Sequence, residues 1–589
     1  MEYWWNIVDL VLIYSVFTVS LNLLLGYAGQ VSVAHAAFGA VGGYLAAYLA
    51  AHAGVGFLAG LALGGLGAGL VGVFVSVPAL RLSAEYLILL TIAVSSIVLS
   101  IVSAVPALGG AQGIVLDAAA DPTPLPGGPL LLPSDWVVPL IVCLAITYAV
   151  CRRMGESAWG RVLRGIRDDD GAIRALGHDV FAYKVVVFGV TAAFAGCAGV
   201  LLFYYNQLAS PDVYGFDVSL TIFAMVIFGG LGNFVGSILG AAVLELLQPL
   251  LEKVVAVDPG NAFLIQLVIY GLGLALLMRI RPQGVLPEGV SLARVLRRRA
   301  SPEPERAAAI AVGEARDGAH DPAPSDVVLA VRGLHKSFGG IAACRDLDLD
   351  LQRGRITALV GPNGAGKTTV FNVLTGALRA DAGSVRLRDI ELVGMKPDAI
   401  ARLGVVRSFQ DVRLFARMTA LDNVMLGVRD PAGDWWRWPS RTRGGENLAD
   451  LFVLPRVAAS VEREARRRAR DWLTLVGLSA VAQTPAGELS FGQQKLVSLA
   501  RLLATDADVL LLDEPASGID VRWVDKVLEL VAFMRAEGKT VCIVEHSLHV
   551  VEQLADTVAF MELGRVTASG SAREVTADPR LAEVYFGTV

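Results

Sequence analysis

A glycine-rich stretch in the second half of the chain has the composition of a phosphate-binding turn. It reads GPNGAGKTT at 361–369, between an apolar run at 356–360 and a helix-compatible segment at 370–374. Strand, turn and helix therefore follow in the order that a GxxxxGK[ST] loop requires, with backbone N–H groups free to surround phosphate oxygens. The residues predicted to form this loop are Gly361, Pro362, Asn363, Gly364, Ala365, Gly366, Lys367, Thr368 and Thr369.

Two side chains of this loop have individual roles in that interpretation. Lys367 is expected to reach the β- and γ-phosphates, and the Thr368 hydroxyl is expected to hold Mg²⁺. Taken alone, the stretch could be a chance glycine-rich turn. The prediction of a nucleotide site therefore depends on residues further along the chain.

Polar side chains follow three other apolar, strand-like runs. The run VLLLDEP ends in Asp513, placed to hold Mg²⁺ through water, and Glu514, placed as the general base that activates the attacking water. Gln410 is predicted to end the strand VVRSFQ and could contact Mg²⁺ or that water. In TVCIVEHS, His546 lies at the end of another predicted strand and could contact the γ-phosphate.

A second anion-binding turn is predicted at the start of ELSFGQQKLVSLARLL. Ser490, Gly492 and Gln493 open an apolar helix there, and a helix N-terminus attracts anions. Phe338, ahead of the phosphate loop, could stack on adenine or could be a core residue. In this order the motifs together predict that the chain binds and hydrolyses ATP with Mg²⁺.

Composition divides the chain into two unlike halves. Of 589 residues, 54% are hydrophobic and 18% are charged, whereas soluble proteins have about a quarter charged. Long apolar runs fill 1–290, and 326–589 reads as a soluble α/β sequence. The net charge of −5 does not suggest a nucleic-acid partner. Five scattered cysteines lack metal-binding spacing and are interpreted as reduced packing residues.

The first half contains runs long enough to cross a lipid membrane. These runs lie at about 5–25, 33–53, 55–77, 86–105, 134–151, 184–206 and 262–280. A longer block at 217–250, interrupted by GGLGN at 229–233, could be two short spans or a re-entrant hairpin. We therefore expect about eight or nine spans, packed as a compact bundle because glycine is frequent in them.

Charge predicts the orientation of the bundle. Arginines gather in the loop 152–174 and after residue 279, so these segments should be cytoplasmic, with the N-terminus outside if there are nine spans. Polar residues within the spans are candidates for the transport path, but hydrogen-bonded helix ends are the favoured interpretation. They are Asn22, Gln30, His35, Glu85, Gln207 and Glu245.

Two connecting segments differ from the spans. Apolar residues at helical spacing in 156–183 predict short amphipathic helices, either a simple positive-inside loop or a docking element for the ATPase. The segment 287–326 is rich in proline, alanine and charge, and is predicted to be a flexible cytoplasmic linker. The predicted domains are therefore a transmembrane domain at 1–286 and an ATP-hydrolysing domain at 327–589.

Several stretches resemble one transporter family. GYAGQVSVAHAAFGAVGGY at 26–44, the segments GRVLRGIRDDDGAIRALGHDVFAYK and SPDVYGFDVSL, and FGGLGNFVGSILGA at 228–241 are similar to the permease of branched-chain amino acid ABC importers. The ATP motifs resemble an ABC nucleotide-binding domain, with LSFGQ where LSGGQ is common and EHS where EHD is frequent. The resemblance implies a multi-span α-helical membrane bundle followed by an α/β P-loop domain of the ABC type.

This resemblance also implies a function. A permease fused to its ATP-binding subunit would import branched-chain or related amino acids across the bacterial inner membrane, with its ATPase domain in the cytoplasm. Cargo would come from an extracytoplasmic binding protein, and residues near Gly160 to Gly177 would form the coupling helix. ATP would lie between two ATPase domains, which requires a second permease and ATPase subunit or a second copy of the chain. The alternatives are an importer of small amides such as urea, an exporter, or a membrane-anchored ATPase without transport.

Overall fold

The computed structural model forms two compact units that do not follow the sequence halves. It describes residues 2–80, 84–116, 133–253, 259–281, 283–288, 326–428, 452 and 455–576. The first unit comprises Met1–Arg167 and Val180–Glu303, and the second comprises Asp168–Asp179 and Pro304–Val589. A short segment from the first half of the sequence thus belongs to the second unit. Most of the predicted linker and the side chain of Glu85 lie outside the described residues.

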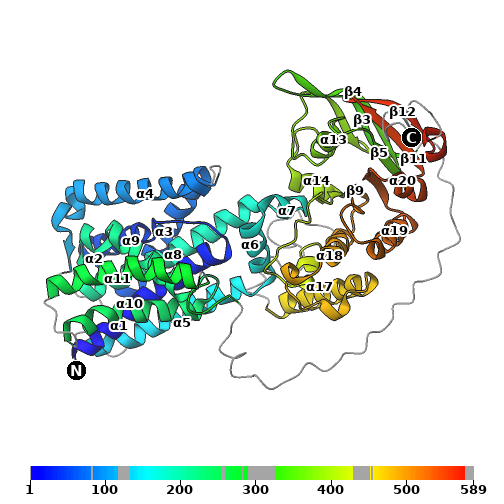
Figure 1. Cartoon of the computed structure of the whole chain (residues 1–589). Coiled ribbons are helices and arrows are strands. Elements are labelled where there is room, and N and C mark those ends of the chain that lie inside the picture. The colour runs from blue at the N-terminus through cyan, green and yellow to red at the C-terminus, as the bar shows by residue number, and fades with distance from the viewer. Residues whose placement is uncertain are drawn as a thin grey trace. The chain divides into compact units, whose positions relative to one another are not determined.

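The described part of the first unit is built mainly of helices (Figure 1). Eight of its helices are long and apolar enough to cross a membrane. The predicted block at 217–250 contains two helices, α9 and α10, separated at the GGLGN sequence. The helices are α1 Glu2–Asn22, α2 His35–Ala53, α3 Phe57–Ala79, α4 Ala84–Ala104, α5 Pro133–Gly155, α6 Ala158–Asp168, α8 Val180–Asn206, α9 Phe216–Gly229, α10 Phe234–Lys253 and α11 Pro259–Ile280.

Glycines allow the helices of this bundle to approach closely. A Cβ added at Gly199 of α8 would overlap the backbone of Gly39 in α2, and one at Gly42 would overlap Gly196. Because lipid offers no hydrophobic drive for helix association, such close backbone contact is the main source of attraction between spans. The two-stranded ribbon of β1 (Ile114–Val115) and β2 (Leu208–Ala209) joins two connections of the same unit.

Asn22, the last residue of α1, joins two breaks in the helical bundle. One is the turn Leu23–Tyr27 that follows α1, and the other is the connection between α9 and α10. Its amide nitrogen donates to the carbonyls of Gly230 and Asn233 and to the Ser237 hydroxyl, at 2.6–3.1 Å. Its amide oxygen accepts from Gly232 N at 2.8 Å. Asn22 is completely buried. The structure therefore places this candidate path residue in a satisfied hydrogen-bond network, as expected for buried polar groups.

The second unit contains two sheets. The six-stranded sheet has the order β12-β11-β5-β10-β9-β8 and is parallel except for the β11–β12 pair. The four-stranded sheet, β4-β3-β6-β7, is antiparallel. The strands are β3 Val327–Phe338, β4 Ile341–Gln352, β5 Ile356–Val360, β6 Ala382–Leu387, β7 Ile390–Glu391, β8 Val405–Arg407, β9 Val509–Asp513, β10 Thr540–Val544, β11 Thr557–Glu562 and β12 Arg565–Gly570.

Helices flank these sheets and complete the α/β domain, so the predicted fold class is confirmed. The central strands β5, β9 and β10 are buried at every position, which explains their continuous apolar sequences. The helices are α7 Asp170–Ala175, α13 Lys367–Leu374, α14 Pro397–Leu403, α15 Ala420–Met425, α17 Pro455–Leu475, α18 Phe491–Ala504, α19 Val521–Ala536, α20 Leu548–Leu554 and α21 Ala572–Thr576.

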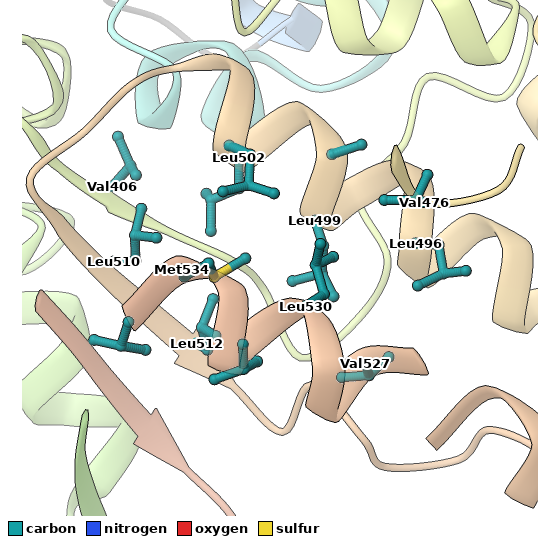
Figure 2. Packing of buried hydrophobic residues seen from close by; sticks show 14 of the residues in the cluster. Val406, Val476, Leu496, Leu499, Leu502, Leu510, Leu512, Val527, Leu530 and Met534 are labelled. Carbon is teal, nitrogen blue, oxygen red and sulfur yellow. The ribbon is translucent and has the colours of Figure 1, made fainter. Parts of the chain in front are cut away.

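One hydrophobic cluster fixes α18 and α19 on the six-stranded sheet (Figure 2). Leu496, Leu499 and Leu502 of α18 face Leu530 and other apolar residues of α19. Residues of β8 and β9 close the cluster from the sheet side. Since each fully buried leucine contributes about 1.5–3 kcal/mol, the position of α18 is firmly determined.

Candidate functional site

The phosphate loop lies between β5 and α13, where the sequence predicted it. Gly361 and Gly366 have φ angles of 150° and 106°, and a Cβ at either would overlap a neighbouring backbone carbonyl. Gly364, with φ of 83°, has open space where a Cβ would lie. Glycine at 361 and 366 is therefore required by packing, and the loop keeps an open side at Gly364.

Lys367 points back into this loop. Its Nζ donates to the carbonyls of Gly361 and Pro362 at 2.6 and 3.0 Å. Burial lowers the pKa of Lys367, while Glu514 and Asp513 act in the opposite direction. Thr368, the next residue of α13, is exposed. The loop thus holds a buried cation beside an accessible hydroxyl.

The side chains of Gln410, Glu514 and His546, which follow strands β8, β9 and β10, lie together. Gln410 Nε2 donates to Glu514 Oε1 at 3.2 Å, and His546 Nε2 lies 3.3 Å from the same oxygen. The carbonyl end of β10 also reaches this position, because Glu514 N donates to Val544 O at 2.9 Å. The parallel sheet brings these residues together, since its strands end at one edge. β8 itself ends at Arg407, three residues before Gln410, where the sequence predicted the strand to end.

Asp513 has a partner that the sequence did not predict. The Arg407 guanidinium forms a buried ion pair with Asp513 and donates to Asn372 Oδ1 at 2.5 Å. Arg407 also lies over the rings of Phe371 and Phe409, at 5.4 and 5.6 Å from their centroids. A basic residue at the end of a buried strand was the signal that could have identified it.

The turn before α18 is a capping box. Ser490 Oγ accepts from Gln493 N at 3.4 Å, and Gln493 Oε1 accepts from Ser490 N at 3.0 Å. Gly492 lies against the indole ring of Trp523 so closely that an added Cβ would overlap it. Phe338 is half exposed at the end of β3, with Lys336 Nζ 5.6 Å from its ring centroid. An exposed ring argues against the alternative that Phe338 is a core residue.

Comparison with known proteins gives a match for each half. Residues 4–278 match the family model for the branched-chain amino acid transport system permease component, and residues 344–517 match that for ABC transporters. The chain is 37% identical over 261 residues to BraF of Pseudomonas aeruginosa, a high-affinity branched-chain amino acid transport ATP-binding protein. That match covers 44% of this chain and 98% of BraF.

The chain belongs to the branched-chain amino acid ABC transporter family. Its ATPase domain is also 34% identical over 264 residues to LivG of Escherichia coli, covering 45% of this chain and 99% of LivG. A solved nucleotide-free ATP-binding cassette from an ABC transporter is 29% identical, with a TM-score of 0.37, covering 44% of this chain and all of that one. By the two family matches, this transporter combines a permease domain and a nucleotide-binding ATP hydrolase in one polypeptide. The permease domain indicates a membrane protein.

The permease sequence contributes a segment to the ATPase unit of the transporter. Within Asp168–Asp179, the Asp169 carboxylate caps α7 through Ala172 N at 3.0 Å and pairs with Arg413 at 3.3 Å. His178 Nε2 lies 3.1 Å from Leu426 O, and Arg402 donates to Gly177 O at 3.4 Å. This segment lies inside the loop that was predicted to be a docking element.

The residue just before that segment is fastened within the permease unit. Arg167 donates to Gly26 O at the end of the π-helical turn Leu23–Tyr27, and pairs with Glu288 at 3.0 Å. Gly29, with φ of 66°, lies against the Arg167 side chain. Arg167, the residue just before Asp168–Asp179, is thus bonded to the π-helical turn that follows α1.

Proposed function

We propose that the transporter is a component of an ATP-driven importer of branched-chain or related amino acids in the bacterial inner membrane. One observation carries the proposal beyond the family assignment. The segment Asp168–Asp179 comes from the permease sequence and packs as part of the ATPase unit. Movement of the ATPase domain would therefore be passed directly to α6 and α8, which flank the segment in the chain.

The site residues support hydrolysis by activated water. Glu514 takes a proton from a water molecule that attacks the γ-phosphorus, and the bond to the β-phosphate oxygen breaks, leaving ADP and phosphate. Gln410 and His546, both in contact with Glu514 Oε1, hold its carboxylate for this step. Lys367 exchanges its loop carbonyls for phosphate oxygens when ATP enters.

The chain also offers oxygen ligands suited to Mg²⁺. The exposed Thr368 hydroxyl and the Asp513 carboxylate belong to the ligand class that this ion prefers, and Gln410 supplies an amide oxygen nearby. Mg²⁺ bound with ATP would neutralise charge on the β- and γ-phosphates. Phe338, half exposed on β3, is proposed to stack on the adenine ring.

Transport in this proposal requires more than one chain. The turn at Ser490, Gly492 and Gln493 acts on the nucleotide bound by an opposing ATPase domain, supplied by a second ATPase subunit or a second copy. A second permease completes the path, and an extracytoplasmic binding protein delivers cargo. We propose a cytoplasmic ATPase domain because arginines gather at 152–174, a range that includes the first part of the segment Asp168–Asp179.

Reconstituted transport tests the proposal. The chain, purified with its co-eluting subunits and identified by mass, is placed in liposomes that contain Mg–ATP. We expect binding-protein-dependent uptake of labelled leucine, and no uptake when Glu514→Gln replaces the unmodified chain. Uptake of urea without leucine would identify an amide importer. Export without a binding protein, or ATP hydrolysis without transport of either solute, would contradict the proposal.

A further inference from the structure

Lys495 occupies a central position among the ATP-handling residues, although no motif assigns it a role. It lies on α18, which begins at the turn containing Ser490. Its ammonium group donates to the backbone carbonyls of Gln410 at 3.2 Å and Glu514 at 3.0 Å. The side chain is buried, with 5% of the residue exposed. One cation thus joins three segments that are distant in the sequence.

Several groups that attract an ammonium ion surround the buried Lys495 side chain. Burial lowers the pKa of Lys495, whereas Glu545, Glu514, Asp513 and Asp411 act together to raise it. Its Nζ also lies 5.8 Å from the centroid of the Phe491 ring. Carbonyls, carboxylates and an aromatic face all attract an ammonium group, so Lys495 is held from several sides.

The backbone of Glu514 requires such support. Its φ angle is 45°, in the left-handed region that costs a residue other than glycine about 1–3 kcal/mol. Val544 O accepts from its N–H, and Lys495 donates to its carbonyl oxygen. The two bonds fix the peptide groups on both sides of the Glu514 Cα. They therefore fix the direction in which its carboxylate points.

The second acceptor of Lys495 belongs to the residue that contacts this carboxylate. Gln410 Nε2 donates to Glu514 Oε1, and both backbones are held by the same ammonium group. Lys495 therefore determines how far apart the two backbones lie. It also connects them rigidly to α18, which the hydrophobic cluster in Figure 2 fixes to the sheet.

We propose that Lys495 is a positioning residue that aligns Glu514 and Gln410 with the Ser490 turn of the same helix. The inference rests on the proposed function, in which that turn engages the nucleotide of the opposing ATPase domain. A displacement of the Ser490 turn on engagement is passed along the first turns of α18 to Lys495, and from there to the two carbonyls that it holds. Occupancy of one nucleotide site then adjusts the water-activating residues of the other.

Steady-state hydrolysis by the full complex tests this inference, with Lys495→Met, Lys495→Gln and Lys495→Arg compared with the unmodified protein. We expect the Met and Gln variants to lose about tenfold or more in kcat, with KM for ATP changed by less than about threefold. The Hill coefficient for ATP should fall to about 1 in both variants. Lys495→Arg, which retains the charge and donors, should recover most of kcat. Lys526→Met is the matched control, because Lys526 on α19 forms an exposed ion pair with Glu529 at 3.0 Å.

Two results would overturn the inference. One is kcat and Hill coefficient in Lys495→Met and Lys495→Gln equal to those of the unmodified complex. The other is loss of ATP binding in parallel with kcat, measured by fluorescence of a labelled ATP analogue, since this would indicate a purely structural role. Absence of ATP hydrolysis by the unmodified complex would instead contradict the proposed function.

Discussion

Glu514 is the residue at which nucleotide binding and turnover should separate. Glu514→Gln keeps the size of the side chain and removes the proton acceptor. We expect ATP binding to persist while hydrolysis falls by about 100-fold or more, the usual contribution of a general base. Phosphate release and binding of a labelled ATP analogue measure the two properties. Hydrolysis at the unmodified rate would show that another group accepts the proton.

Gly492 is constrained by its neighbour as well as by its nucleotide role. A Cβ at this position would overlap the indole of Trp523. Gly492→Ala should therefore displace the turn and reduce hydrolysis by about tenfold or more, in line with loss of a well-oriented anion-binding group. Trp523→Leu alone should retain most activity and should partly restore Gly492→Ala in the double variant. Equal activity of the single Gly492→Ala variant and the double variant would remove the steric explanation.

The sequence predicted residues with motifs better than residues without them. The glycines of the phosphate loop, Glu514 and His546 could be predicted as site residues because their spacing follows from phosphate chemistry. The acceptors of Arg407 and Lys495 could not be predicted, because a buried basic residue does not show in the sequence which groups it meets, and these lie up to about a hundred residues away.

At the scale of elements, the ion pair between Asp169 and Arg413 is expected to contribute to coupling. Asp169→Asn retains a side-chain oxygen to cap α7 and removes the charge, and Arg413→Gln removes the other partner. Each change should lower ATP-driven uptake by about two- to fivefold, while basal hydrolysis stays within about twofold, as for a partly exposed pair. Uptake and hydrolysis by the two single variants and the double variant give the measurement.

The control for the double-mutant cycle of Asp169 and Arg413 is Arg388→Gln, which removes an exposed ion pair with Asp508 elsewhere in the ATPase domain. If the two single effects multiply in the double variant, the residues act independently, and the ion pair has no role in coupling.

Hydrogen bonds of Asn22 stabilise the connection between α9 and α10 in the permease. Asn22→Leu should remove the hydrogen bonds that Asn22 makes with the Gly232 N–H and with the carbonyls of Gly230 and Asn233. We expect a loss of about 2 kcal/mol in stability, the sum of several membrane hydrogen bonds. Thermal unfolding in detergent measures it. Ser96→Ala serves as control, because the exposed Ser96 hydroxyl donates within its own helix, to Ile92 O. An unchanged unfolding temperature for Asn22→Leu would contradict this role.

Hydrophobic runs predicted where the helices of the bundle lie, but they did not predict how the chain turns between α9 and α10. The sequence left 217–250 open between two spans and a hairpin, because apolar composition alone does not determine the path of the chain. The separation of α9 and α10 becomes clear only with the hydrogen bonds of Asn22, whose partners lie more than 200 residues away.

For the whole molecule, the segment Asp168–Asp179 predicts that the linker is dispensable for assembly. Chains 1–303 and 304–589, expressed together, should co-purify, because the segment remains on the first chain and its partners remain on the second. Uptake should stay within about threefold of the intact chain, the reduction reflecting loss of tethering. Co-purification and leucine uptake measure the outcome. Two halves that never associate would assign the docking role to the linker.

The boundary of the ATPase domain has a practical consequence for producing it in soluble form. Ala172, Ile173 and Leu176 are at least 96% buried in the folded chain, and they belong to the same unit as the cassette. A fragment that starts at residue 327 lacks these side chains and leaves the apolar surface beneath them in contact with water, a state that promotes self-association. The ATPase unit of this transporter is therefore discontinuous in sequence, and we expect its ATPase fragment to stay monomeric more readily when the twelve-residue stretch Asp168–Asp179 is supplied with it.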